Sequence, residues 1–136
     1  MADPILVVDT SEIESANAPE VKRLLAELVA FVEEHEAQPI AYSVYFDEAG
    51  TRMTVAQIHP SSESMECHLE MAGPKFRPLG SLLRLTRVDF YGRPSERLVE
   101  QMRRKAELLG GAAVVVNEPH AGFARFGAPV SARAAR

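Results

Sequence analysis

The chain has no tryptophan and only one cysteine, Cys67. One thiol cannot form a disulfide within the chain, and zinc sites built from cysteine need more than one. The lack of a disulfide framework is typical of a reducing compartment, so we expect a cytoplasmic protein. The chain nevertheless has 136 residues, of which 46% are hydrophobic and 25% charged. A domain of this size buries enough surface to fold without a cross-link or a metal.

Long apolar runs and an excess of positive charge are also missing. No segment approaches the ~20 apolar residues that cross a membrane, and no basic segment followed by an apolar one indicates a signal peptide. The net charge is −4, whereas a surface for nucleic acid or anionic lipid needs concentrated basic side chains. We therefore expect neither nucleic acid nor a membrane as a partner.

Hydrophobic patterns predict five strands and three main helices. Strands are expected at residues 5–8, 40–46, 52–59, 85–91 and 112–116, where apolar residues run together or alternate. Helices are expected at residues 19–38, 61–72 and 94–109, with a further short piece at 76–83 after a break at Gly73 and Pro74. The basic run at residues 103–105 is expected to belong to a solvated helix face.

The order of these elements is β-α-β-β-α-β followed by α-β. The first six match the ferredoxin-like arrangement, an α+β fold whose antiparallel sheet carries helices on one face. The strands at 5–8 and 112–116 are apolar on both sides, so the sheet needs a second cover, which either the third helix or a partner subunit supplies. We expect this domain to span residues 1–127, and residues 128–136 to form a disordered tail.

Residues 68–76 read His-Leu-Glu-Met-Ala-Gly-Pro-Lys-Phe and follow the second strand of a predicted hairpin. They resemble the His–Pro–x–Phe helix region of the antibiotic-biosynthesis-monooxygenase-like proteins, with a longer His-to-Pro spacing. The order of elements over residues 5–91 is similar as well. The C-terminal part, from residues 91–96 to residues 120–123, resembles an uncharacterised bacterial branch of the same superfamily.

The resemblance implies a homodimer, because these proteins are dimeric α+β barrels in which two ferredoxin-like sheets pack face to face. It also implies a small hydrophobic or aromatic ligand and a cofactor-independent monooxygenase activity. Several such monooxygenases use a tryptophan and an asparagine in the pocket. This chain has no tryptophan, and its asparagines, Asn17 and Asn117, lie on neither the second nor the third predicted strand. That catalytic pattern therefore does not carry over.

His68 is the candidate catalytic residue. It lies on the apolar stripe of its predicted helix together with Met65, so its side chain should face the sheet. A histidine there can take a proton from an acidic phenol or quinol carbon, ligate a heme iron, or fill the core with one ring nitrogen bonded to a carbonyl. The candidate ligand-binding residues are Tyr42, His59, Met65 and Phe76. Tyr42 can offer its hydroxyl to a ligand, and His59 ends a strand.

Three functions are open at this point. The first is a dimer that binds a small aromatic molecule and oxidises it without a bound cofactor. The second is a non-catalytic dimer that binds a ligand or serves assembly. The third is a heme-binding protein, the one case in which a cofactor is expected. The histidines and the single cysteine predict no metal site of their own.

Overall fold

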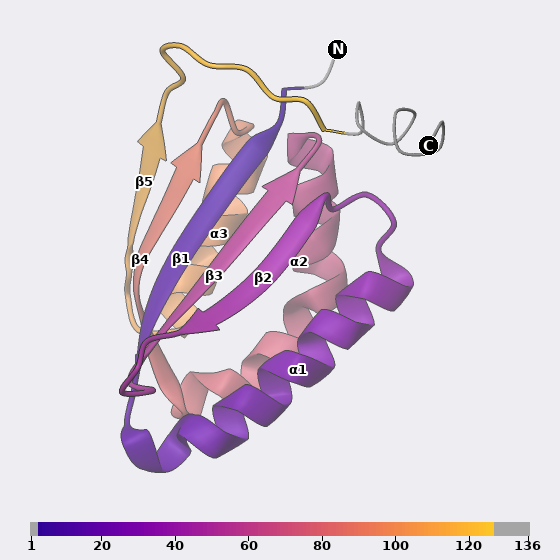
Figure 1. Ribbon diagram of the computed structural model, residues 1–136. Helices are drawn as coiled ribbons and strands as arrows, with labels where there is room; N and C mark the ends of the chain where they lie inside the picture. The colour runs from indigo at the N-terminus through magenta and orange to yellow at the C-terminus, as the bar shows by residue number, and fades with distance from the viewer. Residues whose placement is uncertain (1–2, 127–136) are drawn as a thin grey trace.

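A five-stranded sheet forms one layer of the molecule, in a computed structural model that describes residues 3–126 (Figure 1). The strands are β1 (Ile5–Ile13), β2 (Ala41–Phe46), β3 (Arg52–His59), β4 (Leu83–Tyr91) and β5 (Ala113–Asn117). Their order is β2-β3-β1-β4-β5, with β5 parallel to β4 and every other pair antiparallel. This order confirms the predicted ferredoxin-like α+β fold, which β5 extends. The tail predicted at 128–136 lies outside the described residues.

Three helices form the second layer. They are α1 (Ala18–His35), α2 (Ser62–Phe76) and α3 (Glu96–Leu108), with short 3-10 turns at Ser15–Asn17 and Arg77–Ser81. Serine hydroxyls cap two of them: Ser61 accepts from the Ser64 amide at 3.2 Å, and Ser95 from the Leu98 amide at 3.0 Å. None of the described helices is long and apolar enough to cross a membrane.

The helix break expected at Gly73 and Pro74 was wrong, because α2 continues through Pro74 to Phe76. Pro74 removes one bond of the helix, the one that an amide there would donate to the Glu70 carbonyl, and the helix ends two residues later at Phe76. The 3-10 turn at Arg77–Ser81 then replaces the separate helical piece expected at 76–83, and β4 begins at Leu83. The unbroken α2 keeps His68 and Phe76 on one rigid element.

All three helices cover the same face of the sheet. Ile5 and Val7 of β1 pack with Leu98 and Met102 of α3 in one buried cluster. Farther along the same side of β1, Ile13 packs in a second cluster with residues of α1 and α2. The right-handed crossover rule explains this placement, since β3-α2-β4 and β4-α3-β5 step across the sheet in the same direction between parallel strands.

The opposite face of the sheet carries no helix, and Figure 1 looks onto it with α2 and α3 behind the strands. Neighbouring strands bring Ala41, Ile58, Leu6 and Tyr91 side by side in one row across this face. Tyr45 and Tyr91 remain 57% and 42% exposed. The sequence analysis left two possible covers for the second face, the third helix or a partner subunit. The third helix packs on the other face and therefore does not cover this one.

Candidate functional site

Polar side chains gather on the covered face of the sheet, beneath the helices. Those that are buried are Asp9 and Ser11 on β1, Gln57 and His59 on β3, and Ser64 and His68 on α2. Polar groups in a core cost free energy unless they are hydrogen-bonded. Their bonds therefore separate the groups with a structural role from those that are free to act.

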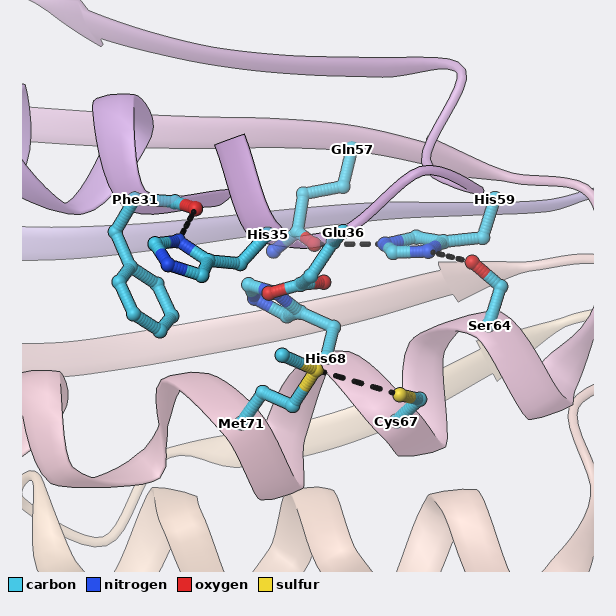
Figure 2. Close-up of polar contacts among 9 residues, drawn as sticks. All are labelled: Phe31, His35, Glu36, Gln57, His59, Ser64, Cys67, His68 and Met71. Atoms are coloured by element: carbon cyan, nitrogen blue, oxygen red, sulfur yellow. Dashed lines mark hydrogen bonds and ion pairs between the residues drawn. The ribbon is translucent and has the colours of Figure 1, made fainter. Parts of the chain in front are cut away.

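His68 forms a buried pair with Glu36, the residue that follows α1 (Figure 2). Its Nδ1 atom lies 3.0 Å from each carboxylate oxygen, and the two side chains are 0% and 4% exposed. Nδ1–H donates to the carboxylate, which leaves Nε2 as the acceptor of a neutral ring. Nε2 is buried and has no hydrogen-bond partner among the described residues. His68 thus holds an unengaged basic nitrogen in the core.

Burial lowers the pKa of His68 below its ordinary value, although the hydrogen bond and the negative charge of Glu36 oppose the change. The ring is therefore neutral near pH 7. A neutral imidazole with a carboxylate behind its Nδ1–H is the arrangement that general-base histidines use. The inward orientation predicted for His68 is confirmed by its complete burial, but its partner is a carboxylate and not the carbonyl expected of a purely structural histidine.

Two aromatic rings enclose His68. The Tyr42 ring meets it edge-on with centroids 5.1 Å apart, and the Phe76 ring does so at 5.9 Å. Burial raises the pKa of Tyr42, and the negative charges of Asp9 and Glu36 raise it further. The Tyr42 hydroxyl therefore stays protonated and is available as a hydrogen-bond donor. Both residues were predicted to bind a ligand, and the structure places both rings in contact with His68.

His59, which was predicted to bind a ligand, is buried and held by two hydrogen bonds. Its Nδ1 lies 2.7 Å from the Ser64 hydroxyl and its Nε2 lies 2.9 Å from Gln57 Oε1 (Figure 2). Nε2–H donates to the amide oxygen and Nδ1 accepts from the hydroxyl, so both ring nitrogens are used. Burial lowers the pKa of His59 to about 4, helped by the neighbouring His68. His59 joins the end of β3 to the first turn of α2 and does not reach a pocket mouth.

Asp9 and Lys105 are two ionisable groups that the sequence patterns did not single out. Burial raises the pKa of the Asp9 carboxyl, while the charges of Lys105 and His68 oppose this. Burial also lowers the pKa of Lys105, and Asp9 opposes that. The Lys105 ammonium lies 4.0 Å from the centroid of the Phe76 ring, a cation–π contact. The expectation that residues 103–105 form a solvated face was therefore wrong for Lys105, which is largely covered.

Two cavities meet at Lys105. An inner cavity of about 30 Å³ lies against the sheet, where Asp9, Ser11, Tyr42 and Gln57 contribute its polar lining. An outer groove of about 500 Å³ lies between α2 and α3. Both are lined by the same three residues, Phe76, Lys105 and Leu109. These side chains separate the groove from the polar core.

Met65 was predicted to bind a ligand, but it lines neither cavity. It is fully buried and packs with Ile5, Val7 and Leu98 in the core between α2, α3 and the sheet. The polar groups that the prediction missed had a signal in the sequence, since Asp9 and Ser11 alternate in phase with Ile5, Val7 and Ile13. A carboxyl on the apolar side of a buried strand is rare and points to a site.

Known structures share this architecture. MupZ from Pseudomonas fluorescens superposes with a TM-score of 0.70 at 14% identity, over 90% of this chain and 94% of MupZ. SnoaB from Streptomyces nogalater, a cofactor-independent oxygenase, gives 0.58 at 14% identity over 69% of this chain and 96% of its own. An antibiotic biosynthesis monooxygenase-like protein from Deinococcus radiodurans gives 0.57 at 17% identity over 67% and 93%. The chain has the antibiotic biosynthesis monooxygenase-like fold.

The likeness is one of structure. No protein-family model matches the chain, and no curated protein matches its sequence. The antibiotic biosynthesis monooxygenase-like fold, as SnoaB and the Deinococcus protein show it, covers 69% and 67% of the chain, so roughly a third of the residues have no counterpart there. MupZ covers 90% and is thus similar to this chain over more of its length.

Proposed function

We propose that the protein is a homodimeric enzyme that oxidises a small aromatic molecule with molecular oxygen, without a bound cofactor, and that His68 is its general base. The observation that carries the proposal is the buried pair of His68 and Glu36 with Nε2 unengaged. The similarity of the fold to SnoaB, a cofactor-independent oxygenase, supports the reaction class. The single free cysteine supports a cytoplasmic location.

The reaction begins with a proton transfer to His68. Nε2 removes a proton from an acidic carbon next to a hydroxylated aromatic ring, and Glu36 stabilises the imidazolium that forms. The carbanion gives its electrons to O₂, and the net change is R₂CH₂ + O₂ → R₂C=O + H₂O. The Tyr42 hydroxyl, kept protonated by its raised pKa, donates to the oxygen on which negative charge develops.

The two cavities hold different reactants. The inner cavity, with its volume of about 30 Å³, has room for one water or one O₂. The organic molecule enters through the groove between α2 and α3, whose volume of about 500 Å³ suits a small ligand. Lys105 separates the two spaces with a long, flexible side chain, so its displacement joins the groove to the inner cavity, where Tyr42 and Phe76 lie between the cavity and the His68 ring.

The homodimer rests on the open face of the sheet. Leu6, Ile58 and Tyr91 form an apolar row there, and Val8 pairs with Ala56 in the next row. A sheet that is apolar on both faces needs two covers, and the three helices supply only one. A second copy that packs the same face against this one gives the second cover and closes a barrel.

A non-catalytic binding protein or assembly module is the second candidate. The observation in its favour is the size of the inner cavity, because about 30 Å³ is far below the ~300 Å³ that a small organic ligand occupies. In this reading His68 and Glu36 are a structural hydrogen-bonded pair that ties α2 to the end of α1. Ligands bind in the outer groove and undergo no reaction.

Heme does not fit the described residues. His68 lines neither of the two cavities, the inner one has only about 30 Å³, and both ring nitrogens of His59 are hydrogen-bonded. A macrocycle would require the packing of Tyr42 and Phe76 around His68 to be undone. Among residues 3–126, moreover, no three His, Cys, Asp or Glu side chains lie together as metal ligands.

Oxygen uptake tests the proposal. The purified protein is incubated with quinols, anthrones and phenolic polyketides while dissolved O₂ is recorded. The wild type should consume O₂, and His68→Gln should lose about 100-fold or more of the rate, the usual contribution of a general base. His35→Gln, which changes an exposed histidine, is the matched control and should keep the full rate. A rate that His68→Gln leaves intact removes His68 from the mechanism.

A further inference from the structure

The groove between α2 and α3 has apolar walls and an open mouth. Its apolar lining comes from Leu69 and Phe76 on α2 and from Leu108 and Leu109 at the end of α3. Leu108 is 80% exposed, which is unusual for a leucine beside a cavity. Such an apolar slot of about 500 Å³ suits the body of a small hydrophobic molecule.

The charged lining of the groove is mainly positive, although Arg104 also lies 4.0 Å from Glu100 on the preceding turn of α3. It has three cations, Arg77, Arg104 and Lys105, and a single acid, Glu70. The Glu70 carboxylate is occupied, because it accepts from Arg97 at 2.6 Å. This local excess of positive charge opposes the net charge of −4 of the whole chain. The groove therefore attracts anions although the protein as a whole repels them.

A buried amide at the groove lacks a partner. Gln101 lines the groove about one helical turn before Arg104 and Lys105, and its Oε1 is buried without a hydrogen-bond partner among the described residues. A side-chain amide can rotate to present either its oxygen or its NH₂ group. Gln101 can thus donate to an anion or accept from a hydroxyl, and either bond would remove the cost of leaving the group unpaired.

We propose that this groove binds an organic anion with an apolar or aromatic body, such as an aryl or alkyl carboxylate. The body packs on Leu69, Phe76 and Leu109, while the anionic group lies at the exposed rim, where Arg77 and Arg104 meet it. Since Phe76 and Leu109 also line the inner cavity, the buried end of the ligand points toward the polar core. Whether the bound molecule reacts depends on the proposed function, but its binding in the groove does not.

A matched pair of fluorescent probes tests the charge requirement. 1-Anilinonaphthalene-8-sulfonate and N-phenyl-1-naphthylamine have the same aromatic body, and only the first carries an anionic group. The sulfonate should bind the wild-type protein at least about tenfold more tightly, the factor that 1.4 kcal/mol provides. Dodecanoate should displace it, whereas dodecanol should do so far less well.

Two variants locate the site. Arg77→Gln combined with Arg104→Gln should remove most of the preference for the anionic probe, whereas Arg93→Gln combined with Arg103→Gln removes the same charge away from the groove and should leave the preference unchanged. Gly80→Phe should block both probes, because Gly80 lines the groove and a Cβ there makes only ordinary contacts, with the Leu109 side chain and the Leu108 carbonyl. Thermal melting confirms that each variant is folded.

Two results would overturn the inference. One is equal affinity of the wild type for the two probes, and the other is an anion preference that survives the loss of Arg77 and Arg104. His68→Gln separates this inference from the proposed function, since it should bind the sulfonate like the wild type. If that variant also retains oxygen uptake, the proposed base is wrong while the anion site stands. If the arginine variants bind the sulfonate normally but His68→Gln consumes no O₂, the anion site is wrong while His68 stands as the base.

Discussion

The imidazole of His68 on α2 donates to the carboxylate of Glu36 at the end of α1, with 3.0 Å from Nδ1 to each oxygen, although the two residues are 32 positions apart in the chain. The bond links the two helices over the sheet and fixes which ring nitrogen carries the proton. It thereby leaves Nε2 as a base in a setting closed to bulk water. The same hydrogen bond therefore joins two helices and prepares His68 to act as a base.

Replacing this carboxylate by an amide should disable the base. Glu36→Gln keeps the shape of the side chain but offers no negative charge to the imidazolium, and its NH₂ group favours the other tautomer of His68. We expect oxygen uptake to fall by about 100-fold, with the substrate concentration at half-maximal rate changed little. Glu33→Gln, an exposed change on the same helix, is the control. An undiminished rate in Glu36→Gln would show that the pair is only structural.

Acid should destabilise the fold through His59. Its pKa falls from 6.5 to about 4 on folding, so the unfolded chain binds its proton more readily than the folded one. The free energy of unfolding should therefore be highest above pH 6.5 and decrease as the pH falls through about 4, by on the order of 3 kcal/mol for this residue. The lowered pKa of His68 adds to the decrease in the same direction.

Urea unfolding at a series of pH values measures this effect. His59→Gln should lower the stability at pH 7, because it disturbs the bonds to Ser64 and Gln57, but it should flatten the slope between pH 6.5 and 4. His120→Gln changes an exposed histidine and should keep the wild-type slope. A slope that is the same with and without His59 would contradict the pKa assigned to it.

Ser95 should be a costly serine to remove. Its hydroxyl accepts from the Leu98 amide at 3.0 Å and donates to the Glu66 carboxylate at 2.6 Å, so it caps α3 and joins it to α2. Ser95→Ala should lower the free energy of unfolding by about 1–2 kcal/mol, the range of a lost cap with a charged partner. Ser81→Ala, in an exposed turn, should cost little, and chemical denaturation compares the two.

Local patterns predicted the elements well but could not pair His68 with Glu36. The alternation of strands and the spacing of helices are set by neighbours in sequence, whereas this contact depends on how two helices lie over a sheet. Lys105 was predictable, since it lies seven residues after Leu98 and three after Met102 on the inner stripe of α3. Its place in a basic run concealed that position.

The face on which α3 lies could also have been predicted from the sequence. Once β3, β4 and β5 are placed in order, right-handed crossovers put α2 and α3 on the same side, because both connections step the same way across the sheet. The hydrophobic pattern alone left this open, since an amphipathic helix fits either face. What the pattern did fix is the two-sided apolar character of β1, with Leu6 and Val8 opposite Ile5 and Val7.

The open sheet face should hold two copies of the chain together. Its central rows contain Leu6 and Ile58, so a charge placed there must be desolvated when a second sheet packs on it. Ile58→Asp should convert a dimer into a folded monomer, as light scattering after gel filtration would show. Leu108→Glu is the control, because it charges the most exposed leucine on the helix side and should leave the dimer intact. A wild-type protein that is monomeric at micromolar concentration would disprove the shared barrel, and the apolar rows on β1 and β3 would then need another cover.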